Sequence, residues 1–224
     1  MMLDHRMYAA QRAALSASTE VLVGDITRSD TIEGIASDVL RDAPPRFALA
    51  GLSMGGIVAL EIWRRMPERV THLALLDTTP YADRPDRRQL RLEQIATVEQ
   101  GKLRKVLVES MKPLYLARKR RGDTRLLKRI LAMALGLGPE VFCRQSLALR
   151  DRSDNSAMLS TVDCPALVLC GREDALCPVE FHATMAQAIP RADLEVLAEC
   201  GHLSPMEEPA AVTAALRRLL KRTA

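Results

Sequence analysis

The chain has 224 residues, of which 48% are hydrophobic and 27% are charged. This length and composition exclude an intrinsically disordered protein and allow one sizeable core with a small appended unit. The net charge of +4 is too small to indicate nucleic-acid binding by itself. No apolar run approaches the roughly 20 residues that cross a bilayer, and the first residues lack a signal-peptide pattern. The sequence therefore predicts a cytoplasmic protein with no membrane span.

The cysteine pattern points to free thiols. The five cysteines are odd in number and show neither CxxC nor the mixed Cys/His spacing of metal sites. Free thiols favour a reducing compartment. They are Cys143, Cys164, Cys170, Cys177 and Cys200.

The first 80 residues alternate short apolar runs with helical patterns. Strands are predicted at Glu20–Gly24, Phe47–Gly51 and Val70–Leu76, and helices at Thr31–Leu40 and Ile57–Met66. Apolar runs of this length between helices are typical of parallel strands that are buried on both faces.

The strand signal disappears over residues 81–150. Apolar residues recur there at helical spacing, and Gly101, Gly122 and the segment Gly136–Pro139 divide the stretch into three or four helices. An all-helical insertion over the ends of parallel strands would be a natural lid.

The alternation of strands and helices returns after Cys164. Strands are predicted at Ala166–Cys170 and Leu194–Leu197, with helices at Val179–Ile189 and Glu208–Leu220. The predicted fold is thus α/β, a mostly parallel, doubly wound sheet. Its core is formed by residues 1–80 and 151–224, and the helical lid by residues 81–150.

The segment Gly51–Gly56, of sequence GLSMGG, matches the G-x-S-x-G pattern of a nucleophile elbow. It follows a predicted strand and opens a predicted helix, so Ser53 would project from a sharp turn. Such a turn is expected to need residues without a Cβ at Gly51 and Gly55. The N–H group of Met54, at the helix start, would stabilise an oxyanion. The alternative is a glycine-rich loop that serves only as a tight turn.

With this element the chain resembles the α/β-hydrolase family. The resemblance extends from about Asp4 to Leu220 and is strongest at GLSMGG, at GREDALCP (residues 171–178) and at GHLSP (residues 201–205). It is closest in pattern to the lidded, esterase-type branch. The resemblance implies a serine nucleophile, then an Asp or Glu, then a His, in that chain order.

A serine hydroxyl needs a base to remove its proton, and His202 is the best candidate among four histidines. His202 follows a predicted strand in a loop, where Gly201 gives the backbone freedom. His5 comes too early, His72 lies within a predicted strand and is interpreted as structural, and His182 lies within a helical pattern. A loop-surface histidine is the alternative interpretation of His202.

The acid that orients the base is predicted to be Asp174, in the loop after strand Ala166–Cys170. The adjacent Glu173 would point elsewhere. Asp77, directly after strand Val70–Leu76, is the competing candidate, because some members of the family place their acid at that point.

A serine nucleophile implies hydrolysis of a carboxylic ester or thioester through an acyl-enzyme, with neither a metal nor an organic cofactor. Two alternatives remain open. The chain could be a non-catalytic binding relative of this fold, or an acyltransferase or C–C bond hydrolase that uses the same three residues.

The stretch from Tyr81 to Arg129 carries an excess of Lys and Arg, including the run Arg118–Arg121. A solvated helical face is one interpretation. A docking surface for an anionic substrate or an acidic acyl-carrier partner is the other. Nucleic-acid binding is not expected, because no aromatic residues interleave with the basic run.

The resemblance also implies a buried strand and a glycine turn before the segment Met1–Tyr8. That strand would lie centrally in the sheet, next to Phe47–Gly51, and its turn would supply a second oxyanion N–H group. Because the chain begins at Met1, where the turn should end, we expect a misplaced start or a truncation. The predicted consequences are an unpaired sheet edge, poor stability and weak activity.

Overall fold

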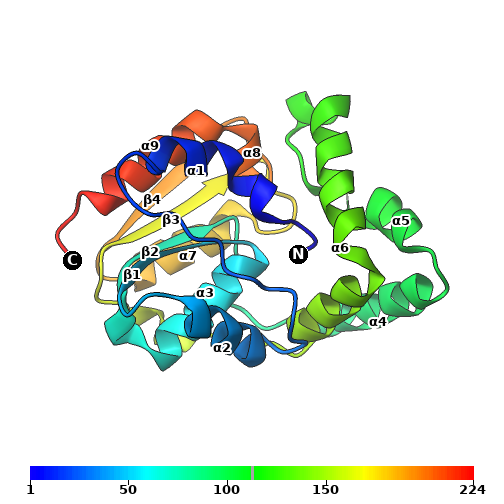
Figure 1. Cartoon of the computed structure of the whole chain (residues 1–224), viewed down its shortest axis with the longest axis horizontal. Helices are drawn as coiled ribbons and strands as arrows, with labels where there is room; N and C mark the ends of the chain where they lie inside the picture. The colour runs from blue at the N-terminus through cyan, green and yellow to red at the C-terminus, as the bar shows by residue number, and fades with distance from the viewer. Residues whose placement is uncertain (112–113) are drawn as a thin grey trace.

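The computed structural model describes residues 1–111 and 114–224. Its centre is a sheet of four strands in the order β1-β2-β3-β4, with every neighbouring pair parallel (Figure 1). The strands are β1 (Phe47–Leu52), β2 (Val70–Leu76), β3 (Ala166–Gly171) and β4 (Ala192–Leu197). These four predicted strands are confirmed, and β4 begins two residues earlier than predicted.

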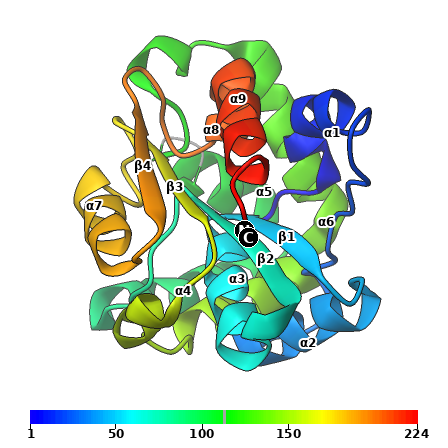
Figure 2. The same ribbon diagram turned by 90° about the vertical axis from the view of Figure 1, so that its left-hand side faces the viewer.

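Helices cover both faces of this sheet, as predicted for a doubly wound fold. Figure 2 shows α2, α3 and α7 on one face and α1 and α9 on the other. The helices packed around the sheet are α1 (Ala9–Leu15), α2 (Ile32–Asp42), α3 (Met54–Arg65), α7 (Val179–Ala188), α8 (Ser204–Glu207) and α9 (Pro209–Leu220). Short helical turns lie at η1 (His5–Tyr8), η2 (Pro67–Arg69) and η6 (Ser156–Thr161).

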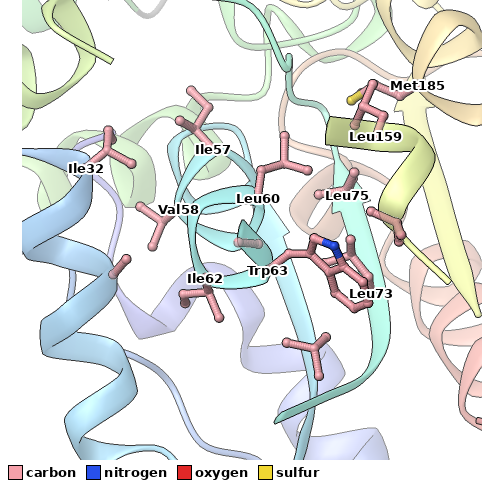
Figure 3. Packing of buried hydrophobic residues seen from close by; sticks show 14 of the residues in the cluster. Ile32, Ile57, Val58, Leu60, Ile62, Trp63, Leu73, Leu75, Leu159 and Met185 are labelled. Atoms are coloured by element: carbon pink, nitrogen blue, oxygen red, sulfur yellow. The ribbon is translucent and has the colours of Figure 1, made fainter. Parts of the chain in front are cut away.

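Strand β2 shows why the central strands read as continuous apolar runs. Leu73 and Leu75 pack with α2, α3 and α7, and Ala74 and Leu76 pack with α1 and α9. Figure 3 shows Leu73 and Leu75 beside Trp63 of α3. Because each face of the strand meets a helical layer, residues 73–76 are apolar on both faces.

The predicted strand at Glu20–Gly24 is wrong. The segment has no regular secondary structure, and its Leu22 and Val23 side chains are 59% and 43% exposed. A strand needs a neighbour that accepts and donates its ladder hydrogen bonds. Among the described residues, β1 pairs only with β2, so no strand lies where this apolar run could extend the sheet.

All the regular secondary structure that is described between β2 and β3 is helical, and residues 81–150 are called the insertion. It contains α4 (Pro85–Glu99), α5 (Leu103–Val106), the π-helical turn η3 (Leu107–Met111), the 3-10 turn η5 (Arg118–Arg120) and α6 (Thr124–Arg150). Helix α6 is kinked where Gly138 takes a φ of 84° before Pro139. The predicted break at Gly136–Pro139 is therefore confirmed.

The insertion has its own hydrophobic cluster, separate from the two that flank the sheet. Ile95 and Val98 of α4 pack with Phe142 of α6 and with Met2. Over the described part of the chain no helix is both long and apolar enough to cross a membrane. The five cysteines are free thiols, as predicted.

Candidate active site

Ser53 lies between the last residue of β1 and the first residue of α3. Its φ of 53° and ψ of −117° are a strained conformation for a residue with a Cβ. Four hydrogen bonds hold this turn: the Ser53 N–H donates to Leu76 O (2.9 Å), and Ser53 O accepts from Gly56 N (2.9 Å), Ile57 N (3.2 Å) and Thr78 Oγ1 (2.7 Å). The predicted sharp strand-to-helix turn is therefore present.

The glycines of the turn have unequal roles. A Cβ on Gly51 would lie 2.2 Å from Gly55 O, so position 51 has no room for a side chain. A Cβ on Gly55 would meet nothing within 4 Å, whereas one on Gly56 would lie 2.6 Å from Thr78 Oγ1. The expectation that Gly55 must lack a Cβ is wrong, because the close neighbour packs against the following residue.

The structure brings together the three residues predicted as nucleophile, base and acid. His202 Nε2 lies 2.9 Å from Ser53 Oγ, and His202 Nδ1 lies 2.8 Å from Asp174 Oδ2. The other oxygen of Asp174 accepts N–H bonds from Leu176 (2.8 Å) and Cys177 (3.0 Å). Both His202 and Asp174 are buried. Their contacts fix the carboxylate and the imidazole ring in one orientation toward Ser53.

Asp77 lies nearby but makes different contacts. Its two oxygens accept hydrogen bonds from the backbone N–H groups of Gly171 (3.0 Å) and Ser204 (3.1 Å). Burial, reinforced by the charge of Asp174, raises the pKa of Asp77 to about 7, against the opposing effect of those two hydrogen bonds. The geometry places Asp174, not Asp77, on His202 Nδ1. Asp77 instead joins the loops that carry the two residues.

Glu207 is a buried carboxylate that sequence reasoning missed. It accepts N–H bonds from Ala117 (2.8 Å), Gly201 (3.1 Å) and Leu203 (3.2 Å), and so holds both neighbours of His202. Burial raises the pKa of Glu207, although the three N–H groups favour its ionised form. Its place five residues after the histidine in GHLSPME is the one signal that sequence offered.

The insertion packs directly against the His202 loop. The His202 N–H donates to Tyr115 O (2.8 Å), and the two rings stack with centroids 6.1 Å apart. A Cβ on Gly201 would lie 2.5 Å from the backbone nitrogen of Ala117. Gly201 is therefore required for close approach of two backbones, in addition to any freedom it gives the loop.

His72 and His182 both have structural contacts, as predicted for His72. His72 Nε2 lies 2.9 Å from Arg222 O, far along the chain from the site. His182 Nε2 accepts the Thr78 N–H (2.9 Å), and burial lowers the pKa of His182. His182 therefore braces the turn after β2 as a neutral ring.

Three residues of the basic run Arg118–Arg121 form ion pairs, and two of these residues pair with carboxylates of the core. Arg118 pairs with Glu173 (3.3 Å), which does point away from His202 as predicted. Lys119 pairs with both Glu199 (3.0 Å) and Glu208 (3.1 Å), and Arg120 pairs with Asp123 and donates to Glu207 O. This run fastens the insertion to the loops that bear Asp174 and His202.

One group of potential metal ligands lies in the described part of the chain. Ligand atoms of Asp174, Cys177 and His202 lie within 4.8 Å of one another. His202 Nδ1 and Asp174 Oδ2 already bond to each other, so a cation there would have to break the contact that orients the imidazole.

Comparison with known proteins places this arrangement in a family. Residues 8–216 match the model of the alpha/beta hydrolase family, and the chain belongs to that family. It is 28% identical over 206 residues to a pimeloyl-[acyl-carrier protein] methyl ester esterase of Aromatoleum aromaticum, covering 83% of this chain and 78% of that protein.

Solved structures agree with the family assignment. A thermophilic esterase from Thermogutta terrifontis superimposes with a TM-score of 0.89 at 32% identity, covering 98% of this chain and 86% of that one. An enol-lactonase from Burkholderia xenovorans superimposes with a TM-score of 0.82 at 22% identity, covering 99% and 88%, and shows the same fold.

The glycine contacts predict opposite outcomes for two alanine substitutions. Gly51→Ala should lower the free energy of unfolding by more than about 2 kcal/mol, because its Cβ would overlap backbone atoms. Gly55→Ala should change it by less than about 1 kcal/mol, because open space surrounds that position and alanine favours a helix. Urea unfolding measures both. Equal losses would contradict the described packing.

The environment of Asp77 predicts a pH-dependent stability. An unfolded Asp titrates near pH 4, whereas folded Asp77 titrates at about 7. Between these values the folded state binds more protons, so stability falls as pH rises from 4 to 7 and levels off above 7. Relative to Asp77→Asn, the native protein should lose on the order of 3 kcal/mol across this window. Urea unfolding at pH 5 and 8 tests this, with the exposed Asp30→Asn as control. A constant difference between the native protein and Asp77→Asn would contradict it.

Proposed function

We propose that this chain is a serine hydrolase that cleaves carboxylic esters or thioesters through an acyl-enzyme on Ser53. The observation that carries the proposal is the unbroken chain of hydrogen bonds from Asp174 through His202 to Ser53 Oγ. Ester hydrolysis is also the activity in the names of the Aromatoleum and Thermogutta relatives. The remaining steps follow from the chemistry of these groups.

In the first half-reaction, His202 Nε2 takes the Ser53 proton while Oγ attacks the carbonyl carbon of the ester. The negative oxygen that forms lies at the start of α3, where the N–H groups of the first helical residues have no acceptor four residues earlier within the helix. The Met54 N–H is the donor we assign to it. The tetrahedral intermediate then expels the alcohol or thiol, which receives its proton from His202.

In the second half-reaction, His202 removes a proton from water, and the resulting hydroxide attacks the acyl group on Ser53. Collapse of this intermediate releases the carboxylic acid and returns the proton to Ser53. Asp174 acts throughout by holding Nδ1 protonated, so that Nε2 faces the serine as an acceptor. Apart from the ester and water, the nucleophile, the base, its orienting carboxylate and the oxyanion donor are all groups of this chain.

The same residues would also serve an acyltransferase or a C–C bond hydrolase. Hydrolysis of esters is favoured because the relatives named above are esterases. A binding protein without activity is disfavoured, because such a protein would have no need of a strained Ser53 held against a buried imidazole.

Replacing the serine tests this proposal. Ser53→Ala should reduce turnover of p-nitrophenyl esters by at least about 10⁴-fold with little change in the unfolding midpoint. A fluorophosphonate probe should label the native protein at Ser53, and the exposed control Ser16→Ala equally, but not Ser53→Ala. Esterase activity that survives in Ser53→Ala would refute the assignment.

We further propose that one class of substrate is delivered on an acidic acyl-carrier protein. Support comes from the several relatives named as esterases of pimeloyl-[acyl-carrier protein] methyl ester, including those of Aromatoleum aromaticum and Nitrosomonas europaea. The first half of α6 presents the exposed side chains of Arg125, Lys128 and Arg129, which make no ion pair within the described ranges. They are better placed to meet an acidic partner than the run Arg118–Arg121.

The test neutralises this face without disturbing the fastened run. Changing Arg125, Lys128 and Arg129 together to Gln should lower kcat/KM for a carrier-bound ester about tenfold or more at low salt, and the loss should shrink as salt rises. Small neutral esters should be unaffected. The matched control changes three exposed cations elsewhere, Arg12, Arg46 and Lys221. Equal effects of the two triple variants would contradict carrier docking on α6.

A further inference from the structure

Two turns with a left-handed backbone lie side by side at the ends of β1 and β2. Ser53 has a φ of 53° and Asp77 a φ of 43°, although neither is a glycine. The register of the sheet pairs Leu52 with Leu76, the residues directly before them, so the two strained turns are neighbours. A strained conformation of this kind persists only where the surrounding structure holds it. The position of the Ser53 hydroxyl therefore depends on what holds both turns.

Thr78 joins the two turns. It directly follows Asp77, it is fully buried, and its Oγ1 donates to Ser53 O (2.7 Å). Its side chain also fills the space beside Gly56, where a Cβ would lie 2.6 Å from Thr78 Oγ1 and 2.7 Å from its Cγ2. Thr78 thus touches the nucleophile turn at two points, and a shift of Thr78 would shift the backbone of Ser53.

His182 of α7 holds the backbone of Thr78. The Thr78 N–H donates to His182 Nε2 (2.9 Å), and His182 Nδ1 lies 3.1 Å from Pro178 O. A backbone N–H can only donate and a carbonyl oxygen can only accept, so the two contacts require a neutral ring with its proton on Nδ1. Burial, which lowers the pKa of His182, favours this neutral form. The ring therefore satisfies both neighbours in one protonation state and one tautomer.

The same ring also contacts the segment that carries the candidate acid. Pro178 directly follows Cys177, whose N–H donates to Asp174 Oδ1 (3.0 Å), and Pro178 is the residue before the first residue of α7. The two nitrogens of His182 therefore link the loop of Asp174 to the turn that supports Ser53.

We propose that His182 is a positioning residue for the reaction at Ser53. Through Thr78 it keeps Ser53 Oγ at hydrogen-bonding distance from His202 Nε2, where the two atoms lie 2.9 Å apart. The inference rests on the proposed function, because it concerns the same nucleophile. His182 acts only through the backbone and hydroxyl of Thr78, and it exchanges no proton with the reacting groups.

The expected effect follows from the loss of one acceptor. Without the ring, the buried Thr78 N–H would have lost its partner, and the strained turn at Asp77 would be free to relax. Thr78 would then move relative to Ser53. A displacement of about 1 Å at a reacting group costs on the order of 10²-fold in rate. We therefore expect slower reaction of Ser53 in protein that is still folded.

The experiment measures the rate at which a fluorophosphonate labels Ser53, together with the urea unfolding midpoint. His182→Leu, which removes both nitrogens, should slow labelling of the folded protein roughly 10- to 100-fold. His182→Gln should recover most of the native rate, because its Oε1 can accept the Thr78 N–H at the position of Nε2. His72→Leu is the matched control, since His72 is also buried and also bonds to a backbone carbonyl, and its labelling should stay within about twofold of the native rate.

A double-mutant cycle tests the path through Thr78. Thr78→Val keeps the shape and the backbone N–H but removes the hydroxyl that donates to Ser53 O, so it should slow labelling about tenfold. The double variant with His182→Leu should be slower by clearly less than the product of the two single effects, because both changes interrupt one path. If His182→Leu fails to fold, Thr78→Val is compared with Thr78→Ser, which keeps the hydroxyl and should label faster.

Three results would overturn this inference alone: native labelling rates in folded His182→Leu, an equal loss in His72→Leu, or single effects that multiply in the double variant. Equal rates in Thr78→Val and Thr78→Ser would do the same. If a fluorophosphonate does not label Ser53 in the native protein, the proposed function fails instead.

Discussion

Three backbone N–H groups converge on the carboxylate of Glu207, and the position of His202 depends on them. Two of them flank His202 in its loop, and the third belongs to Ala117 in the insertion. Without Glu207 these buried donors would be unsatisfied, at about 1–3 kcal/mol each. The same loop is tied to the insertion through Tyr115 O and through the ion pairs of Lys119. The insertion and the candidate base are therefore one mechanical unit, and movement of residues 115–120 would displace the imidazole.

Local patterns predicted the parts of this molecule that depend on neighbouring residues. Buried parallel strands are continuous apolar runs, so the four strands of the sheet were found nearly to the residue. Ser53, Asp174 and His202 could be predicted from their positions after strands and from the chain order of the family. The structure places the three side chains within hydrogen-bonding distance of one another in sequence. The apolar run at Glu20–Gly24 has the same local pattern, yet a strand also requires a partner in space, which composition does not reveal.

Contacts between distant segments were beyond the reach of these patterns. In the sequence Glu207 looks like one carboxylate among 28, and Asp77 is a rival candidate for the acid. Only the fold shows that backbone N–H groups from separate segments surround each of them. The basic run Arg118–Arg121 looks like a free cationic surface because the partners of Arg118 and Lys119 lie more than 50 residues further along the chain. Position 56 likewise has no room for a side chain because Thr78, two residues after the end of β2, packs against it.

The central claim is that His202 activates Ser53 in the orientation set by Asp174. The rate of Ser53 labelling by a fluorophosphonate measures this activation directly, without reference to any substrate. Asp174→Asn should slow labelling at pH 7.5 by about 10³-fold or more, because Nδ1 would lose its acceptor and the useful tautomer. Asp77→Asn, which alters a carboxylate that does not contact the imidazole, should slow labelling by less than about tenfold. The reverse order of the two variants would contradict the account.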